Sequence, residues 1–265
     1  MSNKQLNPLA FGGISRLYGS NTKDLLTNMH VTVIGIGGVG SWASEALVRS
    51  SVEHLSLIDL DDICITNTNR QIHTTSHSIG QLKVESMKER LISINPNCKI
   101  ETRLDFINKE NLTELISKDT DYVIDAIDDA RVKASLVAYC KRNKINIITT
   151  GGAGGQIDPL KITVSDLNKS WQDPLSAKVR NELRRNHGFS RNPKRVYGVE
   201  CVFSTEQVRY PTSDGKVSYA KQTNSNSKKL DCSQGLGASV MVTSTFGMVT
   251  ASRVINRLLA EFKPV

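Results

Sequence analysis

The sequence predicts an α/β fold in which a mostly parallel β-sheet is covered by helices on both faces. The clearest sign is the segment Val31–Asp59, where a β-branched apolar run, a glycine-rich turn, a helical pattern and a second apolar run end at an acid. Strand and helix patterns then continue to alternate as far as Thr150. This order is typical of a Rossmann-like, doubly wound sheet, which binds ligands at the carboxyl ends of its strands.

The glycine-rich turn predicts a nucleotide site. Gly35, Gly37 and the adjacent Gly38 let the backbone turn tightly and approach a phosphate, and Gly40 lets the following helix pack against the strand. The helix N-terminus offers unpaired N–H groups to an anion. Asp59, 19 residues after Gly40, is placed to accept a hydrogen bond from a ribose hydroxyl. A glycine-rich packing turn is the alternative, and the pattern does not say which nucleotide is bound.

The other elements are expected from hydrophobic periodicity and from stop signals. Helices are expected at Gly80–Asn95, Asn108–Ser117, Val132–Lys144, Asp173–Asn186 and about Ala238–Phe262, and strands at Lys99–Phe106, Tyr122–Asp129, Ile145–Thr150, Lys161–Asp166 and Val202–Tyr210. We expect one domain over residues 1–265, with residues 1–30 as an N-terminal arm and residues 211–233 as a polar, mobile loop. The arm's expected anchors are Phe11, Ile14, Leu17 and Tyr18.

The net charge of +8 is concentrated in one part of the second half. Between Lys178 and Lys229 there are 12 Lys and Arg residues against 4 Asp and Glu, so the rest of the chain is balanced at 22 against 22. This segment predicts a basic insertion side that binds a polyanion, most simply nucleic acid. A solvated surface is the alternative.

Composition and targeting signals favour a cytoplasmic protein with reduced thiols. The N-terminus has no apolar signal region, and Ser, Thr and Gly interrupt the apolar stretch near Leu236–Ser252, so a buried helix is expected there and no membrane span. The five cysteines are odd in number and widely spaced, without a CxxC pair, which argues against disulfides and structural zinc. His73 and His77 lack a third metal ligand at a sensible spacing.

Four stretches resemble the ubiquitin-activating-enzyme-like adenylating superfamily, the group of ThiF and MoeB. They are GIGGVGSWASEALVRS from Gly35, DLDDICITNTNRQ from Asp59, the helix that contains Lys83, and VIDAIDD from Val123. Four more resemble one branch, the dehydratases that act on tRNA threonylcarbamoyladenosine: Thr149–Pro159, Asp173–Arg185, Val199–Glu206 and Leu230–Ser239. The resemblance covers nearly the whole chain. The missing CxxC zinc ligands depart from the ThiF and MoeB pattern.

The resemblance implies that the nucleotide is ATP rather than NAD. It implies that a substrate carboxylate attacks the α-phosphate, releases pyrophosphate and becomes an acyl-adenylate. In the dehydratases this carboxylate belongs to the threonyl group of the modified adenosine next to the anticodon, and an internal nucleophile displaces AMP and closes a ring. One alternative is an enzyme that activates the C-terminus of a ubiquitin-like sulfur carrier. Another is an NAD(P)-binding protein or an inactive binding module.

The resemblance also implies roles for individual residues. Asp59 would hold the ribose, Arg70 would clamp the phosphates, and Lys83 would offset their developing negative charge. Asp128 would be the Mg²⁺ ligand. On the residues alone, a solvated loop, a surface lysine and a helix-capping acid are the alternatives for Arg70, Lys83 and Asp128. The implied nucleotide-binding set is Gly35, Gly37, Gly38, Gly40, Asp59, Asp61, Asn67, Asn69, Arg70, Gln71, Lys83 and Asp128.

Two more catalytic residues and several partners are implied in the same way. Arg16 matches an arginine that relatives insert into the partner subunit's site, which implies a homodimer; a solvated arm arginine is the alternative. Cys232 matches a candidate reactive cysteine, and its flanks, Lys228, Lys229 and Asp231, are expected to favour a thiolate. The other cysteines are expected to be inert. The basic segment Lys178–Lys229 would bind tRNA in a salt-dependent way. A monovalent cation and a cysteine-desulfurase or sulfur-acceptor system are further implied, without assigned residues.

Overall fold

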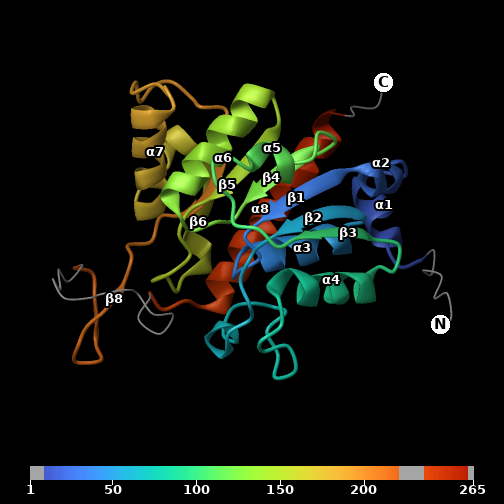
Figure 1. Cartoon of the computed structure of the whole chain (residues 1–265), viewed down its shortest axis with the longest axis horizontal. Coiled ribbons are helices and arrows are strands. Elements are labelled where there is room, and N and C mark those ends of the chain that lie inside the picture. Colours follow the sequence, from blue (N-terminus) through green and yellow to red (C-terminus); the bar gives the residue numbers. More distant parts are fainter. Residues whose placement is uncertain (1–8, 221–235, 262–265) are drawn as a thin grey trace.

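In the computed structural model, a seven-stranded sheet runs through the molecule between two layers of helices (Figure 1). The structure describes residues 9–220 and 236–261. The strands are β1 (His30–Ile34), β2 (His54–Ile58), β3 (Lys99–Arg103), β4 (Tyr122–Asp125), β5 (Asn146–Thr150), β6 (Ile162–Asp166) and β7 (Glu200–Ser204). Their order in the sheet is β3-β2-β1-β4-β5-β7-β6, and every pair is parallel except β6 with β7. The doubly wound, mostly parallel fold is therefore confirmed.

Each face of the sheet has its own hydrophobic core. The first core is covered by α3 (Gly40–Arg49), α4 (Lys83–Ile94) and α8 (Val240–Glu261), and the second by α5 (Leu112–Leu115), α6 (Ala130–Asn143) and α7 (Pro174–Asn186). Val31 and Val33 of β1 join the first core and Ile34 joins the second, because successive strand side chains point to opposite faces. In the described part of the chain, no helix has both the length and the apolar run needed to cross a bilayer.

The N-terminal arm forms two short helices, α1 (Gly12–Tyr18) and α2 (Thr22–Asn28), and α2 leads directly into the amino end of β1. Phe11 is buried as expected, but Leu17 is 72% exposed and Tyr18 is 38% exposed. These two anchors were predicted wrongly. Leu26 of α2, which is fully buried in the first core, attaches the arm to the sheet instead.

The helix expected over Asn108–Ser117 is reduced to the single turn of α5. The cause is local: the side chain of Asn108 accepts hydrogen bonds from the backbone N–H groups of Glu110 and Asn111, and the side chain of Asn111 accepts one from the N–H of Asn108. Asn side chains that bind nearby backbone in this way compete with helix formation.

The strands expected over Lys99–Phe106 and Val202–Tyr210 also end early, at Arg103 and Ser204. Tyr210–Pro211 instead forms β8, which pairs antiparallel with β9 (Val217–Ser218). The first part of the loop expected over residues 211–233 is therefore a hairpin. Residues 221–233, with Cys232, lie outside the described residues.

Candidate active site

The predicted nucleotide-binding segments meet at one edge of the sheet. The glycine turn follows β1, Asp59 follows β2, and Asp128 lies three residues beyond the end of β4. Because these three strands are adjacent and parallel, their carboxyl ends lie side by side. This is the edge at which open α/β sheets bind ligands, and the strand order reverses here, between β1 and β4.

The glycine turn is packed tightly against backbone at Gly35 and Gly40 and is open at Gly37. Gly35 has φ +86°, and a Cβ there would lie 2.8 Å from the carbonyl oxygen of Ala126. A Cβ at Gly40 would lie 1.9 Å from the carbonyl oxygen of Gly35, so no larger residue fits at either position. A Cβ at Gly37, in contrast, would meet only Gln71 Nε2, at 3.9 Å.

Asp59 ties the end of β2 to the glycine turn. Its Oδ2 accepts the backbone N–H of Ile36 at 2.6 Å, and its Oδ1 accepts the N–H of Asp61 at 2.9 Å. The side chain is 11% exposed. A carboxylate has about four acceptor positions, so Asp59 keeps capacity for a ligand hydroxyl.

Lys83, the first residue of α4, is buried, so the surface-lysine alternative is wrong. Its Nζ lies 2.6 Å from Asp61 Oδ2 and 4.0 Å from Asp59 Oδ1. Only 8% of the Lys83 side chain is exposed, whereas Asp61 is 72% exposed. Asp61 can therefore turn into solvent and leave the ammonium group to an anionic ligand.

The loop after β2 holds the expected phosphate ligand Arg70. Trp42 Nε1 donates to the carbonyl oxygen of Arg70 at 3.0 Å, which joins the loop to α3. The Arg70 guanidinium donates to the Thr66 carbonyl and to Asn69 Oδ1, and its side chain lies against Gly38. Because these two partners are neutral oxygens, the charge of Arg70 is not neutralised within the described part of the loop.

Asn67 and Asn69 shape this loop. Asn67 is buried, and its Oδ1 accepts the N–H of Cys64 at 3.0 Å, which closes the 3₁₀ turn η1 (Ile65–Asn67). Asn69 Nδ2 donates to the carbonyl oxygen of Ala238, just before α8. Both amides support the backbone on which Arg70 sits.

A group of buried polar atoms next to the loop has no hydrogen-bond partner among the described residues. The atoms are Gln71 Oε1, Thr74 Oγ1 and both ring nitrogens of His73. Buried polar groups are normally satisfied, and Gln71 faces the glycine turn. These orphaned atoms, the open side of the turn and the uncompensated cation fit a polar, anionic ligand such as a nucleotide. Sequence reasoning considered His73 only as a metal ligand.

Burial, with the positive charges of Lys83 and Arg90, lowers the pKa of His73 to about 4. The folded protein thus holds this imidazole neutral, whereas the unfolded chain takes up the proton near the ordinary value of 6.5. Protonation therefore favours unfolding. The stability that depends on neutral His73 is present above 6.5 and is lost as the pH falls from 6.5 through about 4.

We expect protonation of His73 to lower the free energy of unfolding by roughly 3 kcal/mol as the pH falls from 6.5 to about 4. Urea unfolding of the wild type and of His73→Gln between about pH 7 and about pH 4 measures the effect. The variant should lose less stability than the wild type. An identical pH profile for both proteins contradicts the assignment.

The two acids after β4 have different surroundings. Asp129 is the N-cap of α6, because its Oδ1 accepts the N–H groups of Arg131 and Val132. Asp128 is exposed and makes no side-chain hydrogen bond or ion pair with any described residue. The helix-capping alternative therefore applies to Asp129, and Asp128 is left with both oxygens available to a hard cation.

Beneath this loop lies a buried ion pair that the sequence analysis missed. Lys133 Nζ is 3.0 Å from Asp125 Oδ1, and the two side chains are 1% and 0% exposed. Asp125 also accepts from Thr149 Oγ1 at 2.7 Å and from the N–H of Ile127 at 3.2 Å. The pair thus fixes the start of the segment that carries Asp128.

Arg16 lies apart from this edge, Cys64 lies in the loop after β2, and three other cysteines are buried or partly buried. Arg16 is exposed on α1, near the amino end of β1, so it does not reach the carboxyl edge of its own chain. Burial raises the pKa of the Cys98, Cys140 and Cys201 thiols to about 12, which agrees with inert cysteines.

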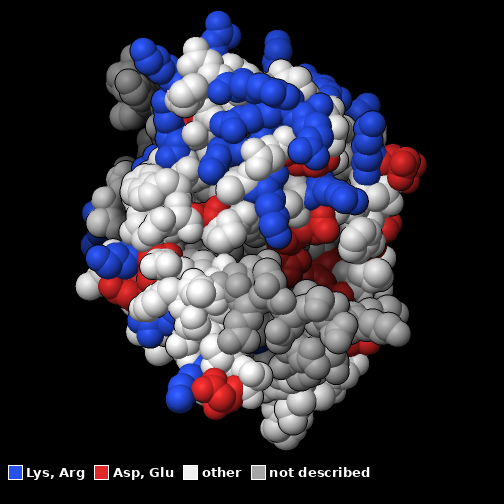
Figure 2. Space-filling view, turned by 90° about the vertical axis from the view of Figure 1, so that its left-hand side faces the viewer, with Lys and Arg blue, Asp and Glu red and all other residues white. Residues whose placement is uncertain are grey.

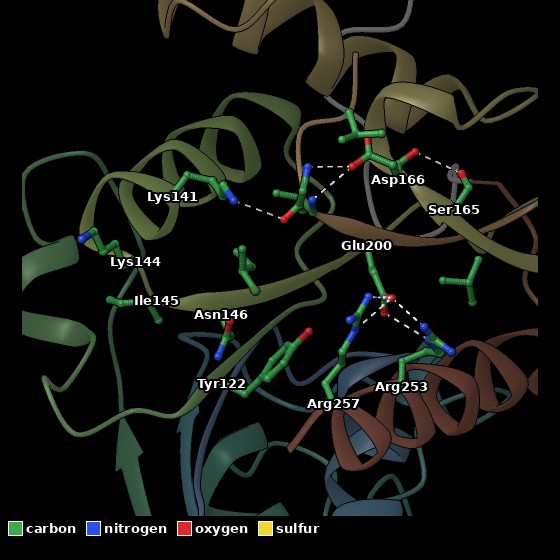
Figure 3. Close-up of a pocket in the computed structure, with 15 residues that line it drawn as sticks. Tyr122, Lys141, Lys144, Ile145, Asn146, Ser165, Asp166, Glu200, Arg253 and Arg257 are labelled. Carbon is green, nitrogen blue, oxygen red and sulfur yellow. Dashed lines mark hydrogen bonds and ion pairs between the residues drawn. The ribbon is translucent and has the colours of Figure 1, made fainter. Parts of the chain in front are cut away.

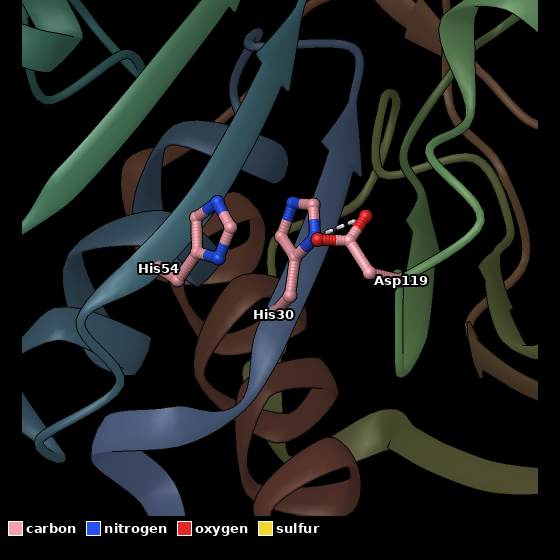
Figure 4. A group of neighbouring side chains, drawn as sticks. All are labelled: His30, His54 and Asp119. Carbon is pink, nitrogen blue, oxygen red and sulfur yellow. Dashed lines mark ion pairs between the residues drawn. The ribbon is translucent and has the colours of Figure 1, made fainter.

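His30, His54 and Asp119 form a second polar cluster at the amino edge (Figure 4). The two rings stack with centroids 3.7 Å apart and planes 5° from parallel. The lone pair of a ring nitrogen lies in the ring plane, so parallel stacked rings do not point at a common metal position. His30 Nε2 is moreover bonded to Ser56 Oγ. The cluster fits a packing role.

The basic segment is only partly a free surface. Figure 2 shows Lys and Arg side chains gathered over the upper half of the face that carries α7 in Figure 1. Arg180 and Arg184 turn inward to Ser170, Tyr197 and Asn168. Lys221, Lys228 and Lys229 lie outside the described residues. The exposed cations on α7 and the loop after it are Lys178, Arg185, Arg191, Lys194 and Arg195.

Comparisons with known proteins agree with this geometry. The ThiF family model matches residues 13–263. The chain is 51% identical over 251 residues to the tRNA threonylcarbamoyladenosine dehydratase of Escherichia coli K12, covering 95% of this chain and 94% of the relative. It is 32% identical to the molybdopterin-synthase adenylyltransferase of Haemophilus influenzae, covering 69% and 75%. The crystal structure of the E. coli dehydratase in complex with ATP superposes with a TM-score of 0.85 at 46% identity, covering 96% and 95%. The chain therefore belongs to the ThiF family, and within it to the group named tRNA threonylcarbamoyladenosine dehydratases.

Proposed function

We propose that this protein is an ATP-dependent dehydratase that cyclises N6-threonylcarbamoyladenosine next to the anticodon of tRNA through an acyl-adenylate. The observation that carries the proposal is the 51% identity, over 95% of the chain, to a relative of that name. A tRNA substrate agrees with a reaction in the cytoplasm. The cations Arg70 and Lys83 at the carboxyl edge suit a nucleotide such as the ATP that the relative holds in its crystal structure.

The residues at the carboxyl edge would each contact a different part of ATP. Asp59 would accept from the ribose, while Arg70 and Lys83 would contact the phosphates from the loop and from α4. Asp128 would be the ligand for Mg²⁺, which when bound supplies positive charge to the phosphates. No described residue is assigned to a monovalent cation.

The chemistry removes one oxygen from the substrate carboxylate. The threonyl carboxylate displaces pyrophosphate from ATP, and an internal nucleophile then displaces AMP, which leaves with that oxygen as the ring closes. A carboxylate is a poor electrophile at neutral pH, so coupling it to AMP creates the leaving group that the cyclisation needs. Lys83 and Arg70 would stabilise the charge that develops on the phosphates. Cys232 would act in catalysis or in substrate handling, and a sulfur-acceptor protein would be a partner.

The competing function is activation of a ubiquitin-like sulfur carrier, suggested by the 32% identity to molybdopterin-synthase adenylyltransferase. ATP–pyrophosphate exchange separates the two functions. We expect exchange to be stimulated by tRNA that carries threonylcarbamoyladenosine and not by a carrier protein with a C-terminal glycine. Stimulation by the carrier alone would overturn the proposal.

We also propose that the protein works as a homodimer in which Arg16 completes the partner's site. The support is that Arg16 is exposed at the opposite edge from its own chain's site. Inactive Arg16→Ala and inactive Asp128→Asn proteins, mixed at equal amounts and allowed to exchange subunits, should then recover about one quarter of wild-type activity, because half of the dimers hold one intact site. The control mixes two preparations of Arg16→Ala. A mixture that stays inactive after proven subunit exchange excludes a role for Arg16 in trans.

A further inference from the structure

A cleft of about 780 Å³ lies at the amino edge of the sheet, away from the nucleotide site (Figure 3). Its floor includes Tyr122, Asn146 and Glu200, the first residues of β4, β5 and β7. Because these strands are parallel, the cleft is separated from the carboxyl edge by the length of the strands, about 17 Å for five residues.

Four cationic side chains line this cleft. Lys141 and Lys144 come from the end of α6, and Arg253 and Arg257 come from α8 (Figure 3). Lys141 and Lys144 are exposed. Lys141 Nζ makes one hydrogen bond, to the Gly198 carbonyl at 3.3 Å, and the Lys144 side chain makes none with the described residues.

The two acids of the cleft already have partners within the protein, Glu200 two arginines and Asp166 backbone N–H groups. Glu200 Oε1 accepts from Arg253 at 2.6 Å and from Arg257 at 2.7 Å. Asp166 accepts the backbone N–H groups of Tyr197 and Gly198 at 2.9 Å and 2.8 Å. With the acids occupied, the cleft presents the two lysines and the outer sides of the arginines to a ligand, so the ligand it fits is an anion.

The cleft continues the basic surface of α7. Asp173, the N-cap of α7, accepts the N–H of Gly152 just past the carboxyl end of β5, so α7 begins at the active-site edge. Its 13 residues span about 20 Å, and the loop after it brings Val196 and Gly198 to the cleft. The exposed cations of α7 and of this loop therefore form a path from the active-site edge to the amino edge.

We propose that this cleft binds the phosphate backbone of the tRNA stem while the modified adenosine occupies the active site about 20 Å away. The inference rests on the proposed function. Cations spread along a path suit successive phosphates better than a single small anion. The exposed lining carries the two lysines beside the apolar Val196, and charged residues are depleted at the core of a protein–protein interface, so RNA is favoured over a protein partner.

The test compares two double variants. Lys141→Gln/Lys144→Gln removes two positive charges from the cleft. The matched control, Lys88→Gln/Lys99→Gln, removes two positive charges from α4 and β3, on the side of the sheet that ends with β3. The dissociation constant is measured against salt for tRNA carrying threonylcarbamoyladenosine and for the isolated anticodon loop without its stem. For the whole tRNA, the cleft variant should bind roughly tenfold more weakly, with a log–log salt slope smaller by about 1.8 for two lost phosphate contacts. Binding of the loop, binding of ATP and turnover at saturating tRNA should stay at wild-type values.

Each possible result either supports tRNA binding in the cleft or overturns it. If the cleft variant and the control bind whole tRNA with the same affinity and slope, the cleft does not hold tRNA. If only inorganic phosphate or AMP, titrated separately, binds more weakly to the cleft variant, the cleft is a small-anion site and the RNA assignment is wrong. The proposed function is judged apart, on the wild type: failure to dehydrate the tRNA overturns the function, whereas dehydration with an unaffected variant overturns only the cleft.

Discussion

Replacing Lys83 by methionine is expected to slow ATP-dependent dehydration by about two to three orders of magnitude. Methionine keeps the length of the apolar stem and removes the only charge that lies within 4.0 Å of both Asp59 and Asp61 among the described residues. In the proposed reaction this charge offsets the negative charge that develops on the phosphates. Single-turnover rates with saturating ATP and tRNA measure the loss directly.

The fold should survive this change. Asp61 is 72% exposed and can be hydrated, and Asp59 keeps its two backbone donors. Lys88→Met, on the same helix but outside the site, is the matched control and should keep wild-type rates. If Lys83→Met unfolds in urea like the wild type and retains its rate within about tenfold, Lys83 does not have the proposed role.

Replacing Lys133 by methionine is expected to lower the free energy of unfolding by about 3 to 5 kcal/mol. The change leaves the carboxylate of Asp125, which is fully buried, without its cationic partner. A buried charge without compensation is far costlier than a lost surface ion pair. Urea denaturation of the variant and the wild type measures the difference.

A double-mutant cycle with Asp125→Asn isolates the pair from other effects of the substitution. The amide oxygen that this change puts in place of the carboxylate can still accept from Thr149, so the double variant should be more stable than Lys133→Met alone. Equal stability of the double variant and Lys133→Met, or a loss below about 1 kcal/mol for Lys133→Met, contradicts a buried ion pair with this energetic weight.

Much of the fold and the placement of the site followed from the sequence because the signals are local. The glycine turn, the acid after each apolar strand and the alternation of strands and helices define the sheet and its carboxyl edge. The backbone around Gly35 and Gly40 leaves no room for a side chain, so a glycine at each position indicates a tight backbone turn. The basic character of the second half was also readable, since charge is a property of composition.

The features that could not be predicted from the sequence depend on contacts between residues that lie far apart in the chain. Asp125 sits inside an apolar run and meets Lys133 only when α6 packs on the sheet. The antiparallel direction of β6 and the β8–β9 hairpin are set by tertiary pairing, which periodicity does not encode. Leu17 and Tyr18 have the pattern of anchors, yet the arm turns them outward. The amino-edge cleft combines residues from α6, α8 and three strands, so no single motif marks it.

The most direct test of the proposed activity is mass spectrometry of nucleosides from tRNA that carries threonylcarbamoyladenosine, after incubation with the protein, ATP and Mg²⁺. For the proposed dehydratase, we expect this nucleoside to lose the mass of one water molecule, the loss to require ATP, and AMP and pyrophosphate to be released with it. An unchanged nucleoside, with the protein folded and ATP bound, would rule out the dehydratase and redirect the search for a substrate to a sulfur-carrier protein.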